Sequence, residues 1–430
     1  MVTLAVFGAL VALMLLGLPI AVSMGLTAIL TFLALGEPGL LSMVPQRMYA
    51  GTTGFPLLAI PFFILAGNLM NTGGMTHRIF RFAQCLVGHI KGGLGHVNVV
   101  GSMIFAGMSG SAVADAAGLG MVEIQAMLKA GYDRRFSAAV TAASSTIGPI
   151  IPPSIPFVIF GSMTGTSVGR LFLGGFLPGL VMGLALMITV YIVAEQRGYP
   201  RERRATLREL LDSSLDGAAA LGAPVIIIGG ILAGIFTPTE AAVVACIYAL
   251  ILGLVVYREI RVPDLPRIFW ETLEHTIRVM FIISAASLFG WMLIQQRIPN
   301  TVVEGLMALT DQRWVILLII NGILLLLGCF MEGIAIMLLT IPVFMPLIAR
   351  VGVDPVHFGV LMTLNLMIGL LTPPVGMALY AVSSVSQVPL WPLARELWPY
   401  IVALLISLGI ITFIPAVVLW VPDLLMGAAR

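Results

Sequence analysis

The chain contains one motif twice, first as Ile147-Gly148-Pro149-Ile150-Ile151-Pro152-Pro153-Ser154 and again, in its second half, as Ile368-Gly369-Leu370-Leu371-Thr372-Pro373-Pro374-Val375. Both copies interrupt long apolar segments. Proline has no amide hydrogen and its ring clashes with the preceding turn, so glycine followed by Pro-Pro breaks a helix. Inside a membrane, the released backbone groups must bind protein, water or an ion. Matching breaks in two halves of a chain are typical of the binding site of a secondary transporter. The motif therefore predicts membrane transport.

Composition places the whole chain, residues 1–430, in one membrane domain. The residues are 59% hydrophobic and 10% charged, whereas soluble domains carry roughly 25% charged residues. The mean hydropathy is +1.07. The stretch from Val2 to Leu35 is too long and apolar for a cleaved signal peptide, and it predicts one long span or two short ones. A net charge of +2 gives no basis for a nucleic-acid partner. Further spans are expected near 54–71, 136–163, 170–194, 218–236, 238–257, 276–296, 355–386 and 396–421.

Charge placement predicts the topology. Basic clusters near residues 78–91, 129–135, 197–208 and 258–267 should share the cytoplasmic side. The first two basic clusters lie on the same side of the membrane only if residues 96–128 enter and leave the membrane on that side, either as a re-entrant hairpin or as two full spans. A second such stretch, 313–347, then begins on the opposite side.

These assignments predict an all-α polytopic membrane protein built as an inverted repeat. Gly107 and Gly328, in the middle of the two hairpin stretches, have the same separation in sequence as Ile147 and Ile368. We call this separation the repeat interval. The first repeat would cover 54–195, with a hairpin at about 96–128 and a broken helix at 136–163. The second would cover 276–421, with a hairpin at about 313–347 and a broken helix at 355–386. The residues between the repeats, 196–275, would form linking spans and cytoplasmic amphipathic segments.

Four segments between the spans are partly amphipathic, as helices lying in the membrane interface would be, although plain loops fit equally well. They are Thr76–Gly88, Ala205–Leu215, Asp264–Glu274 and Thr301–Leu309.

The hairpin tips and helix breaks are the predicted binding site. A broken helix presents carbonyl oxygens at one end and amide hydrogens at the other, which suit a cation and a carboxylate respectively. Two sodium sites are expected, each pairing one tip with one break, with substrate between them. For the serines, small-residue helix packing is the competing interpretation. The candidate residues are Ser109, Gly110, Ser111, Ser145, Thr146, Gly148, Pro149, Gly328, Met331, Glu332, Gly369, Thr372 and Pro373.

Acidic residues inside apolar segments are usually functional because a charge there is costly. Glu332 lies at the second tip, and Asp115 follows the first tip by one helical turn, where it could serve gating or charge balance. Helix capping explains Glu240 better, since it sits at a helix start. Interhelical hydrogen bonds are expected from Asn68, Asn98, Asn321 and Asn365.

Enzymatic chemistry is not predicted. The sequence has no P-loop and therefore no ATP hydrolysis of its own. Ser109 is a poor candidate nucleophile, because Gly107-Met108-Ser109-Gly110-Ser111 is not a Gly-x-Ser-x-Gly motif. Cys85, Cys246 and Cys329 lack metal-ligand spacing, and no cofactor is expected beyond sodium as a coupling ion.

The chain resembles a known family, the large membrane (DctM-like) subunit of tripartite ATP-independent periplasmic (TRAP) transporters. Four stretches carry the resemblance in the family's order, and one departure is Gln125, where proline is expected. They are Gly54–Asn68, the run from Gly92 through Ser109-Gly110-Ser111 to Ser154, Phe236–Ala242, and the run from Phe330 through Asp354–Gly359 and Asn365 to Gly376.

The resemblance implies a sodium-driven uptake system in a bacterial or archaeal inner membrane. Its partners would be a small four-helix membrane subunit and a periplasmic substrate-binding protein. The hairpin-bearing core would move as an elevator. Family substrates are carboxylates, namely C4-dicarboxylates, sialic acids, keto acids and sugar acids. The family's ion-binding segments correspond here to 109–111, 145–148, 328–332 and 369–372.

Two other functions compete with this one. A stand-alone carrier or ion antiporter of similar architecture would work without a binding protein, and it should bury more charge at its midplane. A non-transporting membrane scaffold would show no ion-dependent stability.

Overall fold

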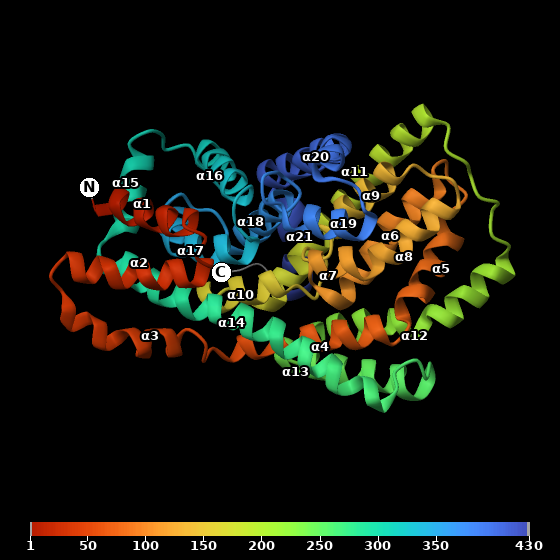
Figure 1. Ribbon diagram of the computed structural model, residues 1–430, viewed down its shortest axis with the longest axis horizontal. Helices are drawn as coiled ribbons and strands as arrows, with labels where there is room; N and C mark the ends of the chain where they lie inside the picture. The colour runs from red at the N-terminus through yellow and green to blue at the C-terminus, as the bar shows by residue number, and fades with distance from the viewer. Residues whose placement is uncertain (1, 428–430) are drawn as a thin grey trace.

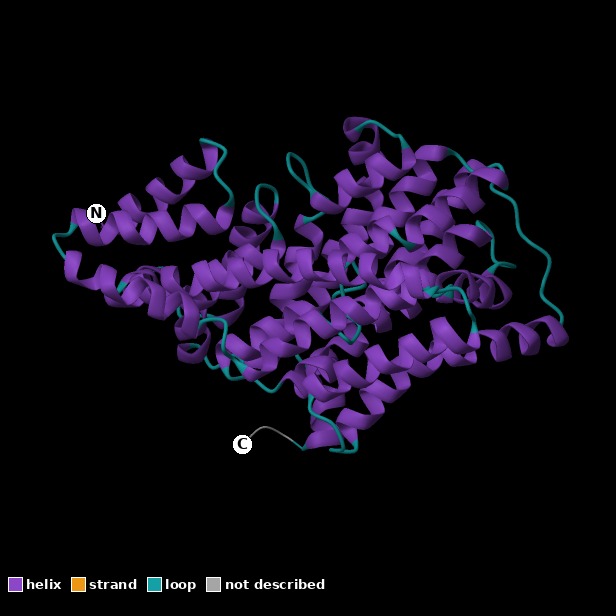
Figure 2. Cartoon of the chain, turned by 60° about the horizontal axis from the view of Figure 1, so that its bottom comes forward, coloured by secondary structure: helices purple, strands orange, loops and turns teal. Residues whose placement is uncertain are grey.

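Helices make up all of the regular secondary structure in residues 2–427, which are the residues that the computed structural model describes (Figures 1 and 2). The side chains of Ser109 and Ala117 are not among the described parts. The α-helices are α1 Val2–Leu15, α2 Ile20–Ala34, α3 Val44–Ala50, α4 Ala59–Thr72, α5 Met75–Val87, α6 Gly93–Ser109, α7 Ala112–Ala117, α8 Leu119–Lys129, α9 Arg134–Ser145, α10 Ile155–Thr164, α11 Val168–Arg197, α12 Leu207–Leu232, α13 Pro238–Ile251, α14 Leu265–Gln295, α15 Ile298–Met307, α16 Arg313–Gly328, α17 Gly333–Arg350, α18 Pro355–Gly369, α19 Met377–Ser386, α20 Leu390–Phe413 and α21 Ala416–Met426.

Seven helical segments of the described chain are long and apolar enough to cross a membrane. The prediction of a polytopic all-helical membrane protein is therefore confirmed. The seven segments are Phe55–Thr72, Val168–Arg197, Leu207–Leu232, Pro238–Val256, Val262–Gln295, Gly333–Arg350 and Leu390–Phe413.

The structure decides one boundary that the sequence left open and corrects three others. The stretch 3–35 forms two helices, α1 and α2, separated by a turn in which Gly17 has a left-handed φ of 84°. The segments 205–215 and 264–274 are not separate interfacial helices, because α12 and α14 run through them without interruption. The expected last span, 396–421, is divided between α20 and α21. Two amphipathic segments do form helices of their own, α5 and α15.

Helix boundaries recur along the chain at the repeat interval. α8 ends at Lys129, and α17 ends one repeat interval later, at Arg350. Asp133 accepts hydrogen bonds from the first amides of α9, and Asp354, again one repeat interval later, does the same for α18. Each hairpin is therefore followed by a capped helix that begins at the corresponding position.

Five helices lie along one long edge of the molecule (Figure 1). Beside them lie the two hairpins, α6–α8 and α16–α17, and the two broken helices, α9–α10 and α18–α19. The five edge helices are α3, α14, α4, α13 and α12, and neighbours in this order pack against each other. We name them the frame. The longest, α14, has 31 residues and is about 46 Å long at 1.5 Å per residue.

Buried asparagines join each hairpin to its broken helix. In the first half, the Asn98 amide of α6 donates to Thr141 Oγ1 at 2.6 Å, and Ser144 Oγ donates to Asn98 Oδ1 at 2.6 Å. In the second half, Asn365 Nδ2 donates to Asn321 Oδ1 at 2.9 Å. The expectation of interhelical hydrogen bonds from these asparagines is confirmed.

We expect Asn98→Ala to destabilise the protein by about 1–2 kcal/mol, because it removes two buried hydrogen bonds, one to Thr141 and one from Ser144. Thermal unfolding in detergent measures the loss. Asn300→Ala on the exposed face of α15 is the matched control, and a fall of equal size there would contradict this role for Asn98.

Candidate functional site

The first hairpin tip lies against the first helix break. Gly110 ends α6 with φ of 59°, and a Cβ added to it would lie 2.7 Å from the Pro153 carbonyl oxygen. Ser111 then caps α7, its Oγ accepting from the Ala114 amide. A Cβ on Gly148 would lie 3.7 Å from the Ser111 carbonyl oxygen. Because Gly110 and Gly148 have no Cβ, the backbone of the tip can lie against the backbone of the break.

The second tip and second break meet in the same way. A Cβ added to Gly369 would lie 2.7 Å from the Cα of Gly328, so α16 and α18 are in backbone contact. The Val375 amide donates to the Cys329 carbonyl at 3.0 Å. Thr372 Oγ1 donates to the Gly369 carbonyl at 2.8 Å and lies 3.4 Å from Cys329 Sγ. Hydroxyl and carbonyl oxygens therefore gather beside this tip, as a hard cation requires.

Glu332 begins α17, and its Oε2 accepts from the Ala335 amide at 3.0 Å. Glu332 corresponds to Ser111 of the first tip, because one repeat interval separates the two residues. The amides that they accept from, those of Ala335 and Ala114, are also one repeat interval apart. The two tips therefore share one capping geometry, made by a hydroxyl in one and a carboxylate in the other.

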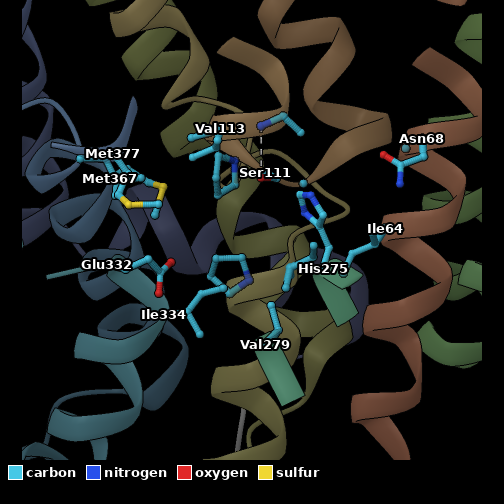
Figure 3. A pocket seen from close by; sticks show the side chains of 18 of the residues that line it. Ile64, Asn68, Ser111, Val113, His275, Val279, Glu332, Ile334, Met367 and Met377 are labelled. Carbon is cyan, nitrogen blue, oxygen red and sulfur yellow. Dashed lines mark hydrogen bonds between the residues drawn. The ribbon is translucent and has the colours of Figure 1, made fainter. Parts of the chain in front are cut away.

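Both tips face one cavity of about 150 Å³. Its lining includes residues of both tips, of both breaks, and of the frame helices α4 and α14. Figure 3 shows Glu332 with Met367 and Met377 on one side, His275 and Asn68 on the other, and Ser111 between them. The cavity thus combines a largely apolar wall with a few polar groups, the usual composition of a site for a small organic ligand.

The predicted site residues divide into two groups. Gly110, Ser111, Pro149 and Glu332 line the cavity. Residues behind this surface, in or beside the tips and breaks, are Ser145, Thr146, Gly148, Gly328, Met331, Gly369, Thr372 and Pro373. The hydroxyls of Ser145 and Thr146 donate to the carbonyls of Ala142 and Ala143 in their own helix, which leaves their lone pairs as acceptors. Ser109 ends α6, and its side chain lies outside the described residues.

Two of the acidic residues singled out in the sequence lie outside the cavity lining. Asp115 does not reach the cavity lining. It is 1% exposed and lies behind the tip, beside Ser102 of α6. Glu240 caps α13 through a capping box with Thr237, which confirms the structural interpretation.

The frame's contribution to the cavity was missed from the sequence. His275 and Val279 line it from α14, and Asn71 lines it from α4. The predicted span began at residue 276, one position after His275, although the helix begins at Leu265. A polar residue at the edge of an apolar run was the available signal. Asn68 was expected to hydrogen-bond between helices, which it does with Thr272 Oγ1 at 2.9 Å, but it also lines the cavity.

Comparison with known proteins places this architecture in a family. The model of the DctM component of tripartite ATP-independent periplasmic transporters matches residues 7–417. This chain belongs to that family. It is 45% identical over 411 residues to the sialic acid TRAP transporter large permease protein SiaM of Vibrio cholerae, with 96% of each chain covered. It is 42% identical over 401 residues to the C4-dicarboxylate TRAP transporter large permease protein DctM of Pseudomonas aeruginosa, with 93% of this chain and 94% of that one covered.

As a TRAP large permease, the protein is a multi-pass integral protein of the bacterial inner membrane. Its relatives are transport permeases and not enzymes. The fold is similar to that of the YdaH transporter of Alcanivorax borkumensis, with a TM-score of 0.67, 13% identity and 90% of each chain covered. Family membership thus rests on the sequence matches, and the structural likeness supports the fold alone.

Proposed function

We propose that this chain is the permease subunit of a sodium-coupled, binding-protein-dependent uptake system for small organic carboxylates. The observation that carries the proposal is the cavity between two hairpin tips and two helix breaks in a TRAP large permease. Two relatives are named for sialic acid and for C4-dicarboxylate, and both of these compounds carry carboxyl groups. The names therefore support small carboxylates as the substrate class. Keto acids and sugar acids belong to the same class.

Sodium would bind where each tip meets its break. At the second pair, the Thr372 hydroxyl and neighbouring carbonyls lie beside the close contact of Gly328 with Gly369. Bound sodium would place positive charge next to a cavity that holds no arginine or lysine among its described lining residues. A carboxylate could then enter, drawn by sodium and by the amides of the broken helices.

An elevator movement is the expected mechanism. The two inverted repeats, 54–195 and 276–421, would supply the hairpins and broken helices of a mobile core. The cavity lies between that core and the frame helices α4 and α14, so movement of the core would carry the cavity past them. The small four-helix subunit would hold the frame, and the periplasmic binding protein would deliver substrate.

Uptake into proteoliposomes tests the proposal. The vesicles would contain this chain with its small subunit, and the cognate binding protein and a panel of radiolabelled carboxylates would be added outside. We expect uptake only with an inward sodium gradient and with the binding protein present. Sodium-driven uptake without the binding protein would instead favour a stand-alone carrier. Uptake that ignores the sodium gradient would refute sodium coupling.

Thr372→Ala should raise the sodium concentration for half-maximal uptake. Loss of one hydroxyl ligand is worth about 1 kcal/mol, or roughly a fivefold change. Sodium titration of uptake measures it. Thr363→Ala is the matched control, because Thr363 is buried on α18, the helix that ends just before Thr372, and its hydroxyl also donates to a nearby carbonyl, that of Gly359, at 2.8 Å. Equal sodium responses in the two variants would remove Thr372 from the site.

A further inference from the structure

Two carboxyl groups are buried inside the first hairpin without partners. Asp115 of α7 is 1% exposed and Glu123 of α8 is 0% exposed. All four of their carboxyl oxygens lack a hydrogen bond to any described residue. Neither residue lines the cavity, so the proposed carboxylate site does not use them. An unpaired buried charge costs several kcal/mol or more, and such groups usually become neutral instead.

The two acids face the same turn of α6. Asp115 lies beside Ser102. Glu123 lies beside Gly101, where an added Cβ would be 3.0 Å from Glu123 Oε1. Gly101 and Ser102 are consecutive residues of α6, and the two carboxyl groups are close enough to each other to interact electrostatically.

The neighbouring hydroxyls have too few protons to stabilise two carboxylates, because Ser102 can turn its single proton to Ser144 or to Asp115 but not to both. Ser102 Oγ donates to Ser144 Oγ at 3.1 Å. Ser144 Oγ donates to Asn98 Oδ1 at 2.6 Å, and Thr141 Oγ1 donates to the Ser137 carbonyl at 2.9 Å. Each hydroxyl has only one proton to donate. The network therefore offers a donated hydrogen bond to at most one of the two carboxyl groups, which leaves the other without stabilisation of its charged form.

Cations are equally unavailable on the helices that pack against α7 and α8. The buried ionisable group of α6 is His96, whose Nε2 lies 3.2 Å from the Lys91 carbonyl. Lys129 and Arg134, at the ends of α8 and α9, are exposed. On α5, Arg78 pairs with Asp216 and Glu259, and Arg81 is exposed. The buried residues of α5 and α19 in the described structure are uncharged, among them Ile79 and Leu379, and Asn71 of α4 contacts Gly118 through its amide.

The second hairpin shows that this architecture does not need the acids. The positions one repeat interval after Asp115 and Glu123 hold Ile336 and Phe344. Both are buried in the core of α17, at 0% and 4% exposure. Apolar side chains thus occupy the corresponding positions of the second hairpin. The two acids of the first hairpin therefore require an explanation other than folding.

We propose that Asp115 and Glu123 form a proton-binding site that holds at least one proton between them at neutral pH. Two neighbouring carboxyl groups that are buried without partners resist ionising together, so at least one of them keeps its proton at neutral pH. The proton comes from water and returns to water. Because the pair lies directly behind the first tip, its protonation would accompany movement of that tip. This last step rests on the proposed transport function.

Infrared spectroscopy of the complex in lipid vesicles tests proton binding without reference to transport. A protonated carboxyl has a carbonyl band that an ionised one lacks. We expect such a band at neutral pH in the wild type, and a clear loss of its intensity in the double variant Asp115→Asn/Glu123→Gln. The single variants Asp115→Asn and Glu123→Gln show which of the two carboxyl groups holds the proton. Glu304→Gln is the matched control, because Glu304 is exposed on α15, outside the first hairpin, and its substitution should leave the band unchanged.

The outcomes separate the proton site from its alternatives. A neutral-pH band that is unchanged in the double variant would overturn the proposal. A band that appears only after sodium is removed would mean that the pair binds sodium instead. Uptake measured from pH 5.5 to 8.5 (about three units around neutral, where a shared carboxyl proton can titrate) tests the coupling. Wild-type uptake should vary with pH more than uptake by Glu123→Gln, whereas parallel profiles would refute coupling and leave the spectroscopic result standing.

Discussion

Gly369→Ala is expected to abolish sodium-dependent uptake and to destabilise the protein by about 3 kcal/mol. The added methyl group would lie 2.7 Å from the Cα of Gly328 and 3.1 Å from its carbonyl carbon. Both obstacles are backbone atoms, so no side chain can rotate away, and overpacking of this kind separates helices. The second tip would then leave its break. Thermal unfolding and proteoliposome uptake measure the two losses.

The reciprocal change provides a second variant, because a Cβ on Gly328 would lie 2.8 Å from the Cα of Gly369. Gly322→Ala is the matched control. It lies on α16, the helix that Gly328 ends, and nothing lies within 4 Å of its added Cβ. Since alanine favours a helix over glycine by about 1 kcal/mol, this control should keep or gain stability. Full uptake by Gly369→Ala would show that the close contact is not required.

The tips and breaks could be predicted because proline and glycine act locally and the motif recurs at one spacing. A Gly-Pro or Pro-Pro step breaks a helix whatever surrounds it. The predicted break at Gly148–Pro153 therefore falls between α9 and α10, and the one at Gly369–Pro374 falls between α18 and α19. The adjoining capping residues, Asp133 and Asp354, follow the same spacing.

The frame could not be predicted as well, because its helices change character without changing secondary structure. α14 begins as an amphipathic segment and becomes an apolar span, yet its backbone hydrogen bonds continue from Leu265 to Gln295. A boundary placed where hydropathy changes therefore excluded His275. Glu123 was missed for another reason. Which side of a hairpin helix faces its partner is decided by packing, and α8 has apolar residues on several sides.

The two halves of the molecule share a backbone plan and differ in their polar groups. The first tip is capped by a hydroxyl and has two buried acids behind it, whereas the second is capped by Glu332 and has apolar side chains behind it. A residue of one tip can therefore be replaced by the residue at the corresponding position of the other tip. Such substitutions distinguish residues required for folding from residues required for transport. Glu332 is the clearest case, because it both caps α17 and lines the cavity.

Glu332→Ser should therefore lower uptake at least about tenfold while leaving stability nearly unchanged. Serine is a good N-cap and already caps the equivalent helix through Ser111. The substitution keeps a hydrogen-bond acceptor for the Ala335 amide but removes the carboxylate from the cavity. If that carboxylate balances the charge of a bound cation, its loss weakens sodium binding by at least about 1.4 kcal/mol, which is tenfold.

Glu332→Ala supplies the comparison, because it removes the cap as well and should cost about 1 kcal/mol of stability in addition. Sodium titrations of uptake and thermal unfolding of both variants distinguish the two roles. If Glu332→Ser transports like the wild type while Glu332→Ala does not, capping is the only function of this residue. If both variants lose uptake and only Glu332→Ala loses stability, the carboxylate acts within the cavity, where its charge faces the proposed sodium and substrate sites.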